Sequence, residues 1–179
     1  MSDGTMTEIS DNVKKVWHVT APWLLIFILF ILSIIPHSIP GYFAVKPDLI
    51  LIAIYYWSIH RPTIVPPSAS FVLGLIMDLF SALPLGLNAF IFVLVQKFTS
   101  DQRKLFLGQP YFVSWVGFAF VCFISTLIKI GVFYLITRNL PVLDLVWLSM
   151  GLTIAIFPIV TILLIASHKI MLRAEGQNA

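Results

Sequence analysis

The sequence predicts an all-α integral membrane protein with six transmembrane helices and both termini in the cytoplasm. Three observations support this prediction. Hydrophobic residues make up 59% of the chain. Charged residues make up only 11%, against about 25% in soluble domains. The apolar residues also fall into separate runs, and helices are expected for them because every backbone polar group must be satisfied inside a bilayer.

The runs divide the chain into a membrane domain and two short tails. The first run follows two lysines, as in a signal peptide, but no small-residue cleavage site follows it, so a retained helix is expected. Proline and glycine mark most of the breaks between runs. The six predicted helices are 17–35, 48–60, 68–82, 85–98, 111–137 and 143–169. The predicted domains are a cytoplasmic tail at 1–16, the six-helix domain at 17–169 and a second cytoplasmic tail at 170–179.

The second and third runs are short for transmembrane helices. Residues 48–60 and 68–82 would form helices of about 20 and 22 Å, against a hydrocarbon core of about 30 Å. They would either thin the membrane locally or cross it incompletely. The third and fourth runs could instead form a re-entrant hairpin from the cytoplasmic side. Both arrangements stay open, because the connection at 83–86 carries no charge.

Basic residues decide the predicted orientation, because they collect in cytoplasmic loops. With the amino terminus inside, Lys46 and Arg138 would lie outside and Lys129 would lie within a helix. The other eight would lie inside: Lys14, Lys15, Arg61, Lys97, Arg103, Lys104, Lys169 and Arg173. Eight basic residues inside against two outside favour this orientation.

A stripe of small and acidic residues marks the third run. Ser70, Gly74, Asp78 and Ser81 recur at a spacing that places them on one helical face. A carboxylate within a membrane is costly unless a partner receives it, and small residues let another helix approach closely. The stripe is therefore either a helix–helix seam within this protein or a surface for a partner or ligand.

Lys129 is the expected ionic partner of Asp78. Both residues lie toward the outer ends of their predicted helices, and the long lysine side chain can reach toward the acid. Asp48 and Asp144 are competing partners. Each also has a simpler explanation, since an acid in a first helical turn complements the helix dipole.

Motifs for catalysis, metal binding or nucleic-acid binding are absent from the sequence. There is no glycine-rich phosphate loop, no zinc-protease motif and no pair of intramembrane acids. The single cysteine and the four histidines share no ligand spacing. The basic residues are scattered among the ends of apolar runs, which argues against a nucleic-acid interface. We therefore expect no enzyme, no cofactor and no metal.

Two stretches of the chain together resemble a known protein family. The first runs from Lys46-Pro47-Asp48 to Trp57 and Arg61-Pro62; the second comprises 74–81 and 84–89. They resemble the rod shape-determining protein MreD family. The departures are modest: Lys46 stands where the family often has arginine, and Ala82 where glycine is common. The resemblance implies a fold similar to the substrate-binding subunits of energy-coupling-factor transporters.

The resemblance also implies a function. It suggests a non-catalytic scaffold in the bacterial inner membrane that helps maintain rod shape by organising lateral peptidoglycan synthesis. The implied partners are MreC and, beyond it, MreB, RodA, its penicillin-binding transpeptidase and membrane lipid. A partner helix would dock on the stripe or on the adjacent turn of Pro84, Gly86 and Asn88. The alternative is the substrate-binding subunit of a vitamin-type transporter, although the first run lacks the spaced alanines used by such subunits for docking.

Overall fold

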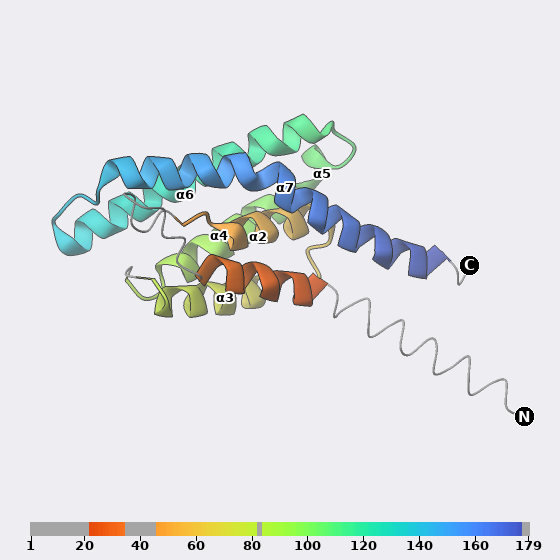
Figure 1. Ribbon diagram of the computed structural model, residues 1–179, viewed down its shortest axis with the longest axis horizontal. Helices are drawn as coiled ribbons and strands as arrows, with labels where there is room; N and C mark the ends of the chain where they lie inside the picture. The colour runs from red at the N-terminus through yellow and green to blue at the C-terminus, as the bar shows by residue number, and fades with distance from the viewer. Residues whose placement is uncertain (1–21, 35–45, 82–83, 177–179) are drawn as a thin grey trace, which may run out of the picture.

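The computed structural model describes residues 22–34, 46–81 and 84–176, with side chains as far as residue 166. All regular structure in these residues is helical (Figure 1). The predicted tail at 1–16 and the start of the first predicted helix lie outside the described residues. The helices are an N-terminal helix (Pro22–Ile34), α2 (Leu49–His60), α3 (Pro67–Leu79), α4 (Leu87–Asp101), α5 (Arg103–Phe106), α6 (Tyr111–Thr137) and α7 (Leu143–Gly176).

The helix boundaries agree closely with the predicted runs. The ends of α2, α3 and α4 lie within three residues of the prediction, and α6 matches 111–137. Two differences stand out. α7 continues to Gly176, beyond the predicted end at 169. The predicted break near residue 104 contains the single-turn helix α5, where the Phe106 ring packs edge-on against Tyr55 with centroids 6.2 Å apart.

α2 is the buried centre of the bundle. Its residues from Leu49 to Ile59 are all buried, by contacts with α4, α5, α6 and α7. A helix enclosed on all sides needs no polar face, which explains its uniformly apolar sequence. α3 and α4 form a hairpin beside it. They lie so close that a Cβ added at Gly74 would be 2.3 Å from the Ala89 Cα.

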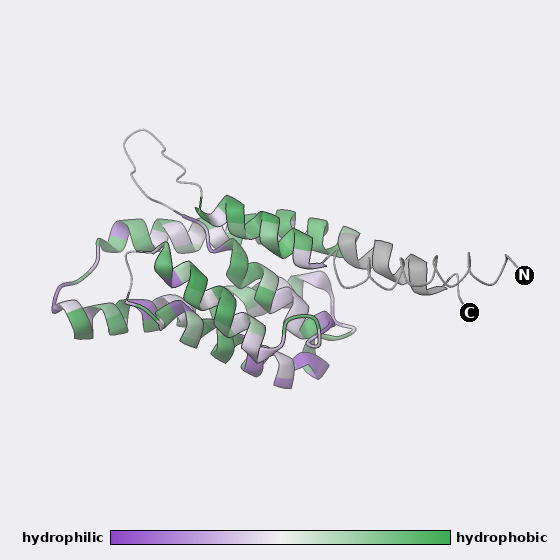
Figure 2. Cartoon of the chain, turned by 90° about the horizontal axis from the view of Figure 1, so that it is seen from below, coloured by the Kyte–Doolittle hydropathy of each residue, from purple (hydrophilic) through white to green (hydrophobic). Residues whose placement is uncertain are grey.

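α6 and α7 are the long helices of the fold. Tyr111–Thr137 and the first 24 residues of α7, Leu143–Ala166, are long and apolar enough to span a membrane. The other apolar helices, such as α2 and α3, are shorter. Figure 2 colours most of the helical residues as hydrophobic, with hydrophilic residues mainly at helix ends and loops, and many large hydrophobic side chains are exposed. This distribution fits a membrane protein, whose outer surface contacts lipid.

The long hairpin extends beyond the start of α2. Near its start, α6 contacts the middle of α2, where the Tyr55 hydroxyl donates to the Ser114 carbonyl. Farther along α6, Lys129 contacts Asp48. α6 then continues to Thr137, about 12 Å farther at the helical rise. The α6–α7 hairpin therefore projects past the short helices (Figure 1), at what we call the Asp48 end of the bundle.

Candidate functional site: a polar cavity at the Asp48 end

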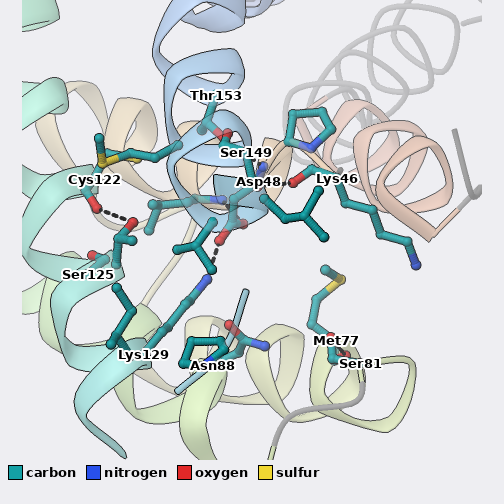
Figure 3. Close-up of a pocket in the computed structure, with 18 of the residues that line it drawn as sticks. Lys46, Asp48, Met77, Ser81, Asn88, Cys122, Ser125, Lys129, Ser149 and Thr153 are labelled. Atoms are coloured by element: carbon teal, nitrogen blue, oxygen red, sulfur yellow. Dashed lines mark hydrogen bonds and ion pairs between the residues drawn. The ribbon is translucent and has the colours of Figure 1, made fainter. Parts of the chain in front are cut away.

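A cavity of about 310 Å³ lies at the Asp48 end (Figure 3). The protruding α6–α7 hairpin forms one wall, and the turn between α3 and α4 contributes another. Apolar side chains such as Phe133 and Val146 line part of it. The polar lining residues, which we call the polar cavity residues, are Ser33, Lys46, Asp48, Ser81, Asn88, Ser125, Thr126, Lys129, Ser149 and Thr153.

An ion pair between Lys129 and Asp48 lies in the cavity lining. Lys129 Nζ is 2.7 Å from Asp48 Oδ2, and the two side chains are 24% and 16% exposed. Asp48 Oδ1 accepts a hydrogen bond from the Leu51 amide and so caps α2. The Asp48 amide in turn donates to the Thr153 hydroxyl. Asp48 therefore connects α2, α6 and α7 at one point.

The expected Asp78–Lys129 pair is absent, because backbone groups satisfy Asp78 instead. Asp78 is 2% exposed and accepts from the amides of Gly86 at 2.8 Å, Asn88 at 3.0 Å and Ala89 at 3.4 Å. These amides lie at the start of α4, where the first N–H groups of a helix lack internal partners. Gly86, the residue before the helix, has no side chain that could cap it. Asp78 therefore supplies the cap for α4 from the neighbouring helix, and Lys129 pairs with its competing partner, Asp48.

The stripe on α3 is a seam within the protein. Ser70, Gly74 and Asp78 are buried, and the close approach of Ala89 at Gly74 places α4 directly against this face. These contacts favour the interpretation as a seam over that as a docking surface, because a second helix could not reach these three residues without displacing α4. The close packing explains why the sequence requires small residues here.

The remaining predicted site residues lie at the turn beside the cavity. Ser81 and Asn88 line the cavity from the two sides of the turn. The Ser81 hydroxyl donates to the Met77 carbonyl at 2.7 Å. Pro84 and Gly86 are half-buried, and Gly86 has a φ of 92°, a left-handed conformation that favours glycine. The structure thus separates the predicted set into an internal seam and a cavity wall.

Sequence reasoning missed the contribution of α7. Ser149 and Thr153 lie four residues apart, so they share one face of the helix. The Ser149 hydroxyl donates to the Lys46 carbonyl at 2.6 Å, and the Thr153 hydroxyl donates to the Ser149 carbonyl at 2.7 Å. Two hydroxyl residues one turn apart in an apolar run were the available signal. Their contacts with Lys46 and Asp48 could not be read from the sequence.

Two deeply buried polar groups in the cavity lack partners. The side chains of Asn88 and Ser125 are each 97% buried, at 3% exposure. Within the part of the chain that the structure describes, neither the side-chain amide of Asn88 nor the Ser125 hydroxyl makes a hydrogen bond, whereas the backbone amide of Asn88 donates to Asp78. In Figure 3 the Asn88 side chain points into the cavity. The polar atoms of these two side chains are open to the cavity and not sealed within the protein, so both groups are free to bind a polar occupant.

Comparisons with known proteins agree with the resemblance noted in the sequence. An uncharacterized protein of Rickettsia prowazekii (strain Madrid E) is 29% identical over 100 residues, which cover 55% of this chain and 56% of that protein. The chain therefore matches about half the length of this relative. No solved structure matches the fold. The family model described as rod shape-determining protein MreD matches residues 14–166. The chain belongs to the MreD family, whose role is in rod shape determination.

Proposed function

We propose that this protein is a non-catalytic scaffold of the bacterial cell-elongation complex and that its polar cavity is the docking site for MreC. Membership of the MreD family supports the role in rod shape. The observation that carries the proposed docking site is the cavity itself, with the unpartnered side chains of Asn88 and Ser125. MreB, RodA and the penicillin-binding transpeptidase are proposed as members of the same assembly.

The arrangement of the short helices supports six crossings of the inner membrane. Ser81 and Asn88, beside the α3–α4 turn, line the same cavity as Asp48 at the start of α2. The hairpin therefore extends as far as α2 does, which favours full crossings over a re-entrant hairpin. With 12, 13 and 15 residues, α2, α3 and α4 would cross a locally thinned bilayer.

The distribution of charge supports an outward-facing cavity. Arg61, Lys97, Arg103 and Lys104 lie at the end opposite Asp48, where the positive-inside rule places the cytoplasm. The cavity then opens toward the outside of the cell, below the tip of the α6–α7 hairpin. A partner anchored by one transmembrane helix would reach it with the segment just outside the membrane.

The docking site proposed here replaces the stripe on α3. Ser70, Gly74 and Asp78 of that stripe are buried beside α4. Its fourth member, Ser81, lies with Asn88 at a cavity wall. Docking at the cavity needs no rearrangement of the α3–α4 seam. It would also provide the hydrogen-bond partners that Asn88 and Ser125 lack.

The test combines depletion in the native host with a cavity variant. Depletion should turn rod-shaped cells round, and the wild-type gene should restore the rods. Ser125→Leu fills the cavity from α6 and should lower MreC recovery in detergent by about tenfold while the protein remains folded. Ser68→Leu makes the same change at an exposed serine of α3 and should leave recovery unchanged.

Two results would contradict the proposal. Cells that stay rod-shaped on depletion would remove the role in elongation. Normal MreC recovery with Ser125→Leu, together with normal rescue of shape, would remove the cavity as the docking site. Thermal unfolding in detergent shows whether each variant is folded.

A small-solute transporter subunit is the second candidate, favoured by one observation. A volume of about 310 Å³ is at the lower end of the range for small-molecule pockets, which is about 300–1,000 Å³. For this function, depletion should create a growth requirement for one solute and leave cell shape intact. The same depletion experiment therefore separates the two candidates.

A further inference from the structure

We propose that the polar cavity recognises a carboxylate, carried by an aspartate or glutamate side chain in the docked segment of the partner. This inference rests on the proposed docking of a partner protein at the cavity and names the chemistry of that contact. Two side chains of the cavity would receive the carboxylate: Lys46 supplies the positive charge and Asn88 the hydrogen-bond donors.

The charge of the cavity favours an anionic occupant. Lys46 and Lys129 contribute two positive charges and Asp48 one negative charge, so the charged lining residues sum to +1. Lys129 and Asp48 neutralise each other at 2.7 Å. Lys46 has no ion-pair partner among the residues that the structure describes. The uncompensated charge is therefore that of Lys46.

The unpartnered polar groups can both donate to an anion. The Asn88 amide has two N–H donors, and the Ser125 hydroxyl has one. A carboxylate can accept several hydrogen bonds at once, and bonds to a charged acceptor are about twice as strong as neutral ones. The carboxylate would thus bind the Asn88 side chain, which otherwise lacks a partner, whereas Ser125 lies on the far side of the cavity from Lys46 (Figure 3). Asp78 does not compete for these donors, since backbone amides already bind it.

The depth of the cavity favours a polypeptide over a lipid as the source of the anion. Lys129 lies about 12 Å below the end of α6 at Thr137. Lipid phosphates lie at the membrane surface, so a lipid would have to sink its charged group toward the hydrocarbon layer. A polypeptide segment can descend along the apolar side chains of Phe133 and Val146, which also line the cavity. The proposed occupant is therefore an acidic residue flanked by apolar ones.

Charge reversal at Lys46 is the direct test. Lys46→Glu should lower recovery of full-length MreC from detergent-solubilised host membranes by about tenfold or more, because two carboxylates would then face each other. Lys46→Arg keeps the charge and should retain most of the recovery. Arg138→Glu is the matched control: Arg138 is an exposed cation at the same end of the bundle, outside the cavity lining.

Suppressor selection identifies the acidic partner. Among cells carrying Lys46→Glu, those that regain rod shape should carry an aspartate or glutamate of MreC changed to lysine or arginine. Undiminished recovery with Lys46→Glu would overturn the proposal. Native mass spectrometry provides a second way to overturn it. If the Lys46→Glu protein loses a tightly bound anionic lipid while its recovery of MreC is unchanged, the anion that the cavity recognises is a lipid and not a carboxylate of the partner.

The outcomes also separate this inference from the docking proposal. If Ser125→Leu abolishes recovery while Lys46→Glu does not, the partner docks at the cavity but its carboxylate is not what is recognised. If neither variant changes recovery, the docking proposal itself fails. Lys46→Met adds a neutral side chain to the series, and its loss of MreC recovery should lie between those of Lys46→Arg and Lys46→Glu.

Discussion

Two carboxylates in this bundle, those of Asp78 and Asp48, are bound by different kinds of groups. Asp78 is sealed between α3 and α4, where three backbone amides bind it. Asp48 lies at the edge of an open cavity, where the side chain of Lys129 binds it. The first arrangement fixes a helix terminus and leaves nothing for a ligand. The second lies among polar groups that still lack partners, and this difference is why we propose the cavity, and not the α3–α4 seam, as the functional site.

Removal of Asp78 should have the largest effect on stability. Asp78→Leu would leave the amides at the start of α4 unpaired in a buried site and remove its cap, at a cost of about 3 kcal/mol or more. The free energy of unfolding in mixed micelles measures this loss. Asp78→Asn retains one carbonyl acceptor and should lose roughly half as much. A stable Asp78→Leu protein that fails only to bind MreC would show that the seam, too, is a working surface.

Gly74 tests the same seam through packing. An alanine Cβ here would lie 2.3 Å from the Ala89 Cα, which requires α3 and α4 to separate. Gly74→Ala should therefore destabilise the fold by about 2 kcal/mol, within the range for overpacked cores. Thermal unfolding in detergent measures the change. An unchanged melting temperature would mean that the two helices are not in such close contact.

Breaking the Asp48–Lys129 pair should have a smaller effect. Lys129→Met leaves the Asp48 carboxylate with only the Leu51 amide, and we expect a loss of about 1 kcal/mol because the pair is partly exposed. The double variant Asp48→Asn with Lys129→Met should lose less than the sum of the two single losses. Strictly additive losses, measured by the same unfolding assay, would indicate that the pair contributes no coupling.

The smallest effect is expected where a helical glycine has no neighbours. An added Cβ at Gly131 of α6 meets no other atom within 4 Å. Gly131→Ala should be neutral or should stabilise by up to about 1 kcal/mol, because alanine is the better helix former. This variant is the control for Gly74→Ala. A comparable loss at both glycines would attribute the Gly74 effect to the substitution itself rather than to the seam.

The sequence predicted the helices better than the contacts between them. Apolar runs and the prolines between them locate α2, α3, α4 and α6 to within a few residues, because these signals are local. The stripe of Ser70, Gly74 and Asp78 also predicted a close helix contact. Which helix would fill it was left open by the spacing alone.

The pairing of Asp78 was predicted wrongly for a physical reason. Matching an acid to a basic side chain considers only charged residues, whereas the start of a helix offers uncharged amides that bind a carboxylate equally well. Gly86 carries no capping side chain, and that was the available clue. The cavity itself could not be predicted. It depends on the contacts of Ser149 and Thr153 with residues more than 100 positions away.

The central claim is that the polar cavity, and not the surface of α3, receives the partner. Photo-crosslinking in living cells tests it most directly, with benzoylphenylalanine replacing one phenylalanine at a time. Phe133 lines the cavity, and Phe71 is 48% exposed on α3. The account predicts MreC adducts from position 133 and none from position 71. Adducts from position 71 alone would contradict it.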